Sequence, residues 1–231
     1  MELKIRDKVL FKTEKDVINN IHKIGKRYQK TIAWLQGIQS QAPTKEAEIL
    51  KNILVSTLGY TKYIKSGAFK DIQLLALGVR SVLENLSRAR FIMKDDENLD
   101  RWLSEVITDQ KTVIKGFLSL GDASSDSIKA LEIELTRLDR LCEKYNFPVV
   151  KQPQQVKTMT EAVGLVEDYD SIYKLTSKLI HPSSLYINSR STLDNKEYHN
   201  ILVICGQLYL ISMLNEICMK LNAPSAIADM T

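Results

Sequence analysis

The chain has 231 residues, of which 44% are hydrophobic and 26% charged, and it carries a formal net charge of +4 at pH 7. These proportions are ordinary for a soluble globular protein, and nine glycines and five prolines are too few for an all-β fold with many turns. The mild positive charge permits an anionic partner but does not demand one.

Helical periodicity predicts the first elements of the chain. In residues 13–40, apolar or aromatic positions recur at steps of three and four residues, which predicts a helix of about seven turns. Pro43 opens a second helix, which ends at Gly67. Residues 68–94 form a third helix, and because it is apolar nearly all round from Ile72 to Val79, we expect it to be central.

The middle of the chain continues the helical pattern. A helix over residues 99–120 is expected to face inward with Trp102, Val106, Val113 and Phe117, and residues 127–145 form another amphipathic helix. Residues 146–157, NFPVVKQPQQVK, contain two prolines and are predicted to be an internal loop or crossing linker. Thr158 and Glu161 then have the spacing of a capping box at a helix start.

The last long helix starts after the acidic turn at Asp194 and contains the most apolar segment, residues 201–221. This segment includes a glutamine, an asparagine and a glutamate, and it lacks the run of roughly 20 apolar residues that a bilayer requires. We therefore expect a buried helix and no membrane span. Since no segment shows a strand pattern or a repeat, the sequence predicts an all-α fold, a single-domain bundle of six to eight helices over residues 1–231.

The cysteines and the N-terminus predict a cytoplasmic protein. Cys142, Cys205 and Cys218 include no Cys-x-x-Cys pair, and any disulfide would leave one thiol over. The first residues, MELKIRDKVLFKTEKD, are charged throughout and lack the apolar core of a signal peptide.

The stretch YKLTSKLIHPSS contains the first group of candidate site residues. Tyr173, Ser177 and His181 stand four residues apart and therefore share one face of a helix, with Ser184 just beyond. Pro182 disfavours the helical conformation at His181, so we expect the helix to end there, where its dipole favours a protonated imidazole. Histidine is also the side chain that most readily gains or loses a proton near neutral pH.

A second stripe lies on the helix expected to be central. Arg80, Glu84 and Arg88 are also four residues apart, and two arginines for one glutamate leave cationic donors over. If this helix faces the first stripe, one polar pocket collects Arg80, Glu84, Tyr173, Ser177 and His181. Arginine binds phosphate or carboxylate bidentately, and histidine donates or accepts a proton.

Three interpretations of this pocket stay open. In the first, it binds an anionic ligand, a nucleotide or an RNA phosphate, which Arg80 anchors while Glu84 orients Arg80. In the second, the chain is a metal-independent ribonuclease, in which His181 moves the proton and Arg80 stabilises the charged phosphorane. In the third, the network only fixes helix register, in a protein whose helices dimerise or bind a partner.

Other signals are weaker. Five basic residues gather on about two turns of the first helix: His22, Lys23, Lys26, Arg27 and Lys30. This face can contact phosphates, but a solvated helix face is the simpler interpretation, because the aromatic residues near it fit the core stripe. The sequence has no Gly-rich phosphate loop, and its histidines lack the spacing of a zinc site, so we expect no cofactor and no metal.

The two stripes resemble the recurring pattern of a helical bacterial family of uncharacterised function. The matching residues are Arg80-x-x-x-Glu84 and Tyr173-x-x-x-Ser177-x-x-x-His181, and the resemblance covers residues 74–221. That family is distantly similar to the HEPN superfamily, whose helical domains are often dimeric RNases or nucleotide-binding modules in defence and toxin–antitoxin systems. The resemblance implies a HEPN-like bundle, a nucleotide or RNA ligand, a homodimer and a bacterial defence setting.

The chain departs from the HEPN signature at one point. That signature places an arginine before the histidine with four to six residues between them, but the positions at those three spacings before His181 hold Thr176, Leu175 and Lys174. The resemblance therefore does not imply a ribonuclease role. It implies only a helical bundle with an Arg/His pocket.

Overall fold

This computed structural model describes residues 13–41, 44–120, 124–148 and 150–228. The chain forms two compact units: unit 1 consists of residues 1–90 and 159–231, and unit 2 of residues 91–158. The boundaries fall inside α4 and α7, and each unit is described by itself. Two units defined by contacts can still unfold together, so the single domain expected over residues 1–231 stays a prediction.

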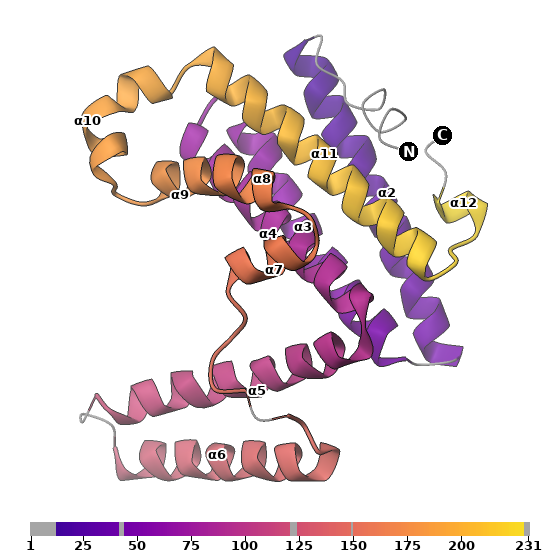
Figure 1. The fold of residues 1–231 in the computed structure, drawn as a ribbon, viewed down its shortest axis with the longest axis vertical. Helices are drawn as coiled ribbons and strands as arrows, with labels where there is room; N and C mark the ends of the chain where they lie inside the picture. Colours follow the sequence, from indigo (N-terminus) through magenta and orange to yellow (C-terminus); the bar gives the residue numbers. More distant parts are fainter. Residues whose placement is uncertain (1–12, 42–43, 121–123, 149, 229–231) are drawn as a thin grey trace. The chain divides into compact units, whose positions relative to one another are not determined.

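Figure 1 shows a structure built from helices. Unit 1 contains α2 (Glu14–Gln41), α3 (Lys45–Gly67), most of α4 (Ile72–Lys94), α8 (Val166–Asp168), the π-helix η1 (Tyr169–Tyr173), α9 (Lys174–Ile180), α10 (Ser184–Leu193), α11 (Lys196–Lys220) and α12 (Ser225–Ala228). Unit 2 contains α5 (Asp96–Leu118) and α6 (Ser125–Tyr145), and α7 (Val156–Ala162) crosses the boundary.

The all-α prediction is confirmed. The described residues include no strand and form ten helices when α8, η1 and α9 are taken as one continuous segment. This is more than the six to eight expected, because α7 to α10 and α12 are short. A helix of two or three turns contains too few apolar positions for its period to be recognised in the sequence.

The core of unit 1 is built from the stripes that the sequence predicts. The expected face of α2 is buried, and the hydroxyl of Tyr28 donates to the carbonyl of Leu210 in α11 at 2.9 Å. The residues of α4 between Ile72 and Val79 are mostly buried, as expected for a central helix. That helix begins at Ile72 and not at residue 68, because Phe69 takes a left-handed conformation with φ of 59°.

Helix α11 is the one described helix that is long and apolar enough to cross a membrane, by length and composition alone. Most of its apolar window is buried in the fold, where α11 packs against α2 and α3. A core helix of a bundle has the same composition and length, so this burial accounts for its apolar character.

In unit 2, helices α5 and α6 form a hairpin with a small core. Its buried residues are Ile107, Ile114 and Leu138. The expected inward face of α5 is wrong, because Val106, Val113 and Phe117 are 45, 58 and 55% exposed. Helix α5 carries two neighbouring apolar stripes, and α6 packs on the one that contains the isoleucines.

The segment between α6 and α7 is attached to α5. Residues 146–155 connect the two helices, where the carboxylate of Glu105 accepts from the backbone N–H of Gln154 at 2.9 Å and the hydroxyl of Thr108 donates to the carbonyl of Val150 at 2.8 Å. The predicted capping box is wrong, since Thr158 lies inside α7, which begins at Val156. Helix α7 begins soon after Pro153, the second proline of the segment, and therefore earlier than the Thr/Glu pattern indicates.

Candidate functional site

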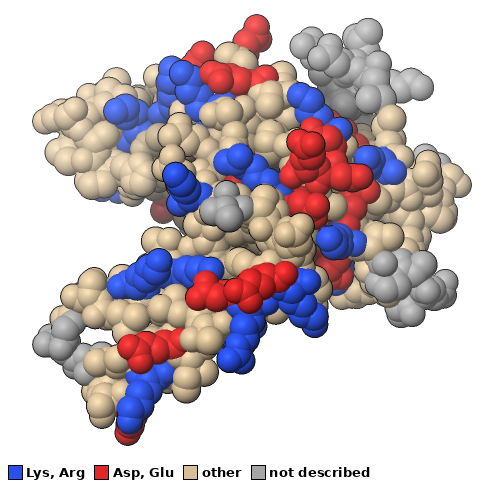
Figure 2. All heavy atoms as spheres, turned by 60° about the horizontal axis from the view of Figure 1, so that its bottom comes forward, with Lys and Arg blue, Asp and Glu red and all other residues tan. Residues whose placement is uncertain are grey.

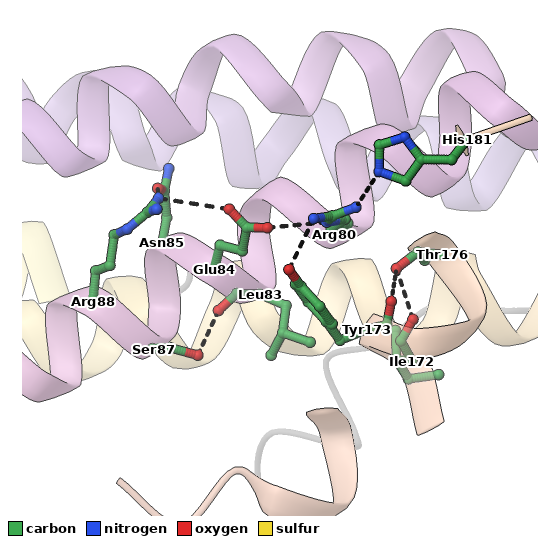
Figure 3. A network of polar contacts seen from close by, with 10 residues as sticks. All are labelled: Arg80, Leu83, Glu84, Asn85, Ser87, Arg88, Ile172, Tyr173, Thr176 and His181. Atoms are coloured by element: carbon green, nitrogen blue, oxygen red, sulfur yellow. Dashed lines mark hydrogen bonds and ion pairs between the residues drawn. The ribbon is translucent and has the colours of Figure 1, made fainter. Parts of the chain in front are cut away.

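Two helices of unit 1 bring most of the candidate residues together (Figure 3). Helix α4 presents Arg80, Glu84 and Arg88 on successive turns, and the η1–α9 segment presents Tyr173 and then His181. His181 ends α9 with extended backbone angles, φ −95° and ψ 153°, as the following proline predicts.

The guanidinium of Arg80 is held by three partners. Its Nε donates to Glu84 Oε1 at 3.0 Å, Nη2 donates to the hydroxyl of Tyr173 at 2.8 Å, and Nη1 lies 3.2 Å from Nε2 of His181. The Arg80 side chain is 18% exposed. Its position is therefore fixed by contacts from two segments that are about a hundred residues apart in the sequence.

The charge of the cluster is not balanced. Glu84 contacts Arg80 through one carboxylate oxygen and lies 3.7 Å from Nη1 of Arg88 through the other. Two guanidinium groups thus share one carboxylate, and the cluster has a net charge of +1 when His181 is neutral.

The contact with Arg80 indicates which ring nitrogen of His181 accepts a hydrogen bond. A guanidinium group only donates hydrogen bonds, so a hydrogen bond between these two atoms has Nε2 as its acceptor and leaves Nδ1 as the ring donor. The protonated imidazole expected from the helix dipole stays a prediction.

Tyr173 extends the cluster to a residue that the sequence analysis missed. Its ring lies under the guanidinium, with Cζ of Arg80 4.5 Å from the ring centroid, and it stacks on Tyr169 with centroids 4.7 Å apart. Burial raises the pKa of Tyr173, so it remains a neutral phenol near neutral pH. Tyr169 lies four residues before Tyr173, and extending the stripe by one step in the sequence would have found it.

Comparison with known proteins identifies this part of the chain. A protein-family model, DUF5677, a family of unknown function, matches residues 73–198, which is more than half of the chain. The chain belongs to the DUF5677 family. No curated protein and no solved structure matches it significantly. The match confirms the expected family of helical proteins without known function, while the HEPN likeness stays a prediction.

All the candidate residues lie within the DUF5677 match, but two of them stand apart from Arg80. Ser177 is half-buried on α9, and Ser184 is exposed in the first turn of α10. Among the interactions of the described residues, none links either hydroxyl to the cluster. Pro182 and the start of α10 turn the chain away after His181, so the helical spacing does not continue to Ser184.

A second histidine of this DUF5677 protein, His199, contacts the backbone of Phe69 and the side chain of Asp194. His199 is buried; its Nδ1 accepts from the backbone N–H of Phe69 at 3.1 Å, and Nε2 lies 2.8 Å from the carboxylate of Asp194. The ring is therefore neutral with its proton on Nε2, and it connects the left-handed turn before α4 to the start of α11. Within the described residues, no group of three or more His, Cys, Asp or Glu side chains is placed to hold a metal ion.

Proposed function

We propose that this DUF5677 protein is a binding module that holds the phosphate group of a nucleotide or an RNA against Arg80 and His181. The observation that carries the proposal is the guanidinium of Arg80, which is fixed by three partners although only one of them, Glu84, is anionic. An arginine has five N–H donors, and the described contacts use three of them. The remaining donors are oriented before any ligand arrives.

The roles of the neighbouring residues follow from their contacts. Glu84 and Tyr173 orient the guanidinium, and the Nδ1–H of His181 supplies one more donor at the exposed side of the cluster. Arg88 adds the second positive charge. A phosphate suits this set better than a carboxylate, since it has more acceptor oxygens for the several donors of the cluster.

The Arg80 cluster is a local positive site, in which two arginines contact one glutamate. Figure 2 shows basic and acidic side chains on the same face, with neither sign covering it. We propose that one phosphate group binds at this cluster, in a cytoplasmic, HEPN-like protein that forms a homodimer and serves a bacterial defence system.

A ribonuclease is the second candidate. The distance of 3.2 Å between Arg80 and His181 supports it, because a proton-transferring histidine next to a cation is the pair that metal-independent phosphodiester cleavage needs. Here the two residues come from different helices, so their contact does not require the HEPN spacing.

Variants at His181 and Arg80 test both candidates. We expect His181→Gln to fold, because the side-chain oxygen of glutamine can accept from Arg80 where Nε2 does, and to retain most of the thermal stabilisation by ATP or by a short single-stranded RNA. Arg80→Lys keeps the charge but loses the fork of donors, so it should lose that stabilisation. Melting curves with and without each ligand measure the effect.

The same proteins are assayed for RNA cleavage. Cleavage by the wild type that His181→Gln abolishes would favour the ribonuclease over the binding module. If neither ligand stabilises the wild type and Arg80→Ala lowers the free energy of unfolding by about 1–3 kcal/mol, the network is structural and the proposal is wrong.

A further inference from the structure

A groove between α2 and α3 in unit 1 is lined by none of the residues of the Arg80 cluster. One stripe of each helix lines it, from Ile21 to Gln29 in α2 and from Val55 to Lys65 in α3, and its volume is about 410 Å³. At a rise of about 1.5 Å per residue, these stripes are roughly 12–15 Å long, which is two to three turns of a helix.

The rim of the groove is cationic. Lys26, Lys62 and Lys65 are exposed, His22 lies beside them, and the lining includes no Asp or Glu. None of the three lysines forms an ion pair with a described residue. Because α2 and α3 run in opposite directions (Figure 1), His22, Lys62 and Lys65 lie toward one end of the groove, Val55 lies toward the other, and Lys26 lies between them.

Gly25 and Gly59 leave space at the bottom of the groove. A methyl group at Gly25 would meet only Leu58 Cδ1 at 3.8 Å, and one at Gly59 would meet nothing within 4 Å. Packing within the chain therefore does not require glycine at either position, although glycine in a helix interior is less stable than alanine. Ile21, Val55 and Leu58 make up the apolar part of the lining, beside the polar Gln29 and Thr61, and Val55 is 49% exposed.

We infer that this groove binds an amphipathic helix of a partner protein, with acidic residues beside its apolar seam. The two glycines let the backbone of the partner helix approach closely. The apolar residues of that helix pack on the apolar part of the groove, and the lysines attract its carboxylates. An RNA strand would account for the lysines alone, because phosphate contacts need neither an apolar floor nor glycines, and the lining has no aromatic residue on which bases stack. The acidic residues of the partner lie over Lys62 and Lys65.

A peptide-display selection on the full chain tests this inference. The library consists of helix-forming peptides of about 15 residues, long enough to span the groove. We expect enriched peptides to repeat apolar residues at steps of three and four and to carry an excess of glutamate and aspartate. A synthetic copy of one enriched peptide, labelled with fluorescein, then serves as the probe in anisotropy titrations.

Matched variants locate the binding site. Gly59→Leu fills the groove with a side chain that favours helix and should abolish binding, whereas Gly37→Leu, in the same pair of helices but outside the groove, should leave it unchanged. Lys62→Gln combined with Lys65→Gln should weaken binding about fivefold at low salt, as expected for two exposed ion pairs. The control combines Lys70→Gln with Lys196→Gln, which removes the same charge elsewhere.

Three results would overturn the inference. The selection enriches no peptide, or only neutral or basic ones; the enriched peptide binds Gly59→Leu as well as the wild type; or a fluorescein-labelled single-stranded RNA, and no peptide, depends on Lys62 and Lys65. The last result would assign the groove to nucleic acid. Because the probe and the variants do not involve Arg80, the outcome stands apart from the phosphate-binding proposal.

Discussion

At the scale of single residues, burial separates the three thiols. Burial raises the pKa of Cys205 to about 11, and it also raises the pKa of Cys218. Cys142 is half-buried in unit 2, where the ammonium group of Lys111 donates to its sulfur at 3.8 Å. A thiolate is the reactive form of cysteine, so the surroundings of each sulfur decide its reactivity.

We expect iodoacetamide at pH 8 to modify Cys142 well before Cys205 and Cys218. A thiol with a raised pKa stays protonated below that pKa, so at pH 8 only about one part in a thousand of Cys205 is thiolate. Mass spectrometry of peptides after timed quenching measures the three rates. In urea all three should react alike, and equal rates in the native protein would contradict the burial argument.

At the scale of helices, close approach depends on Gly78 in α4. A Cβ atom there would lie 2.7 Å from Cγ1 and 2.9 Å from the backbone nitrogen of Ile64 in α3. Gly206 in α11 faces the same isoleucine, since a Cβ atom there would lie 3.3 Å from its Cδ1. Three helices thus meet at Ile64, and the two glycines set how closely they approach.

Gly78→Ala should lower the free energy of unfolding by about 1–3 kcal/mol, because the backbone of α3 must move to admit the methyl group. The matched control is Gly116→Ala in α5, where a methyl group would meet nothing within 4 Å. That variant should gain about 0.5–1 kcal/mol from helix propensity. Urea denaturation measures both, and a stabilising effect of Gly78→Ala would show that the helices are less tightly packed than described.

At the scale of the whole molecule, the two units differ in the size of their cores. Unit 1 buries long apolar stripes from α2, α3, α4 and α11, whereas unit 2 buries three core residues between two helices. Local opening requires less free energy where fewer apolar contacts are lost. Unit 2 is therefore expected to be the less stable part.

Native-state hydrogen exchange tests this difference. Backbone amides in α6 should exchange at least tenfold faster than those in the middle of α11, in keeping with an opening free energy that is lower by about 1.4 kcal/mol or more. Leu54→Ala, in the core of unit 1, should lower global stability by about 2–5 kcal/mol, while Leu138→Ala should mainly speed exchange in unit 2. Equal protection of α6 and α11 would support the single domain expected from the sequence.

The sequence alone determined the local features of this protein. The all-α class, the positions of the long helices, the buried stripe of α2 and the end of α9 at His181 all follow from periods and signals that extend over a few residues. A period is a local property, because side chains three or four residues apart lie on one helix face whatever surrounds them. The stripes of candidate residues were predictable for the same reason.

Only the tertiary structure decided which stripes meet. The contacts of Arg80 with Tyr173 and His181 join residues 93 and 101 positions apart. Packing against α6 also decided which of the two apolar stripes of α5 is buried, because the two stripes look equivalent in the sequence. Both outcomes depend on which partner covers a face, and a single helix carries no information about its partner.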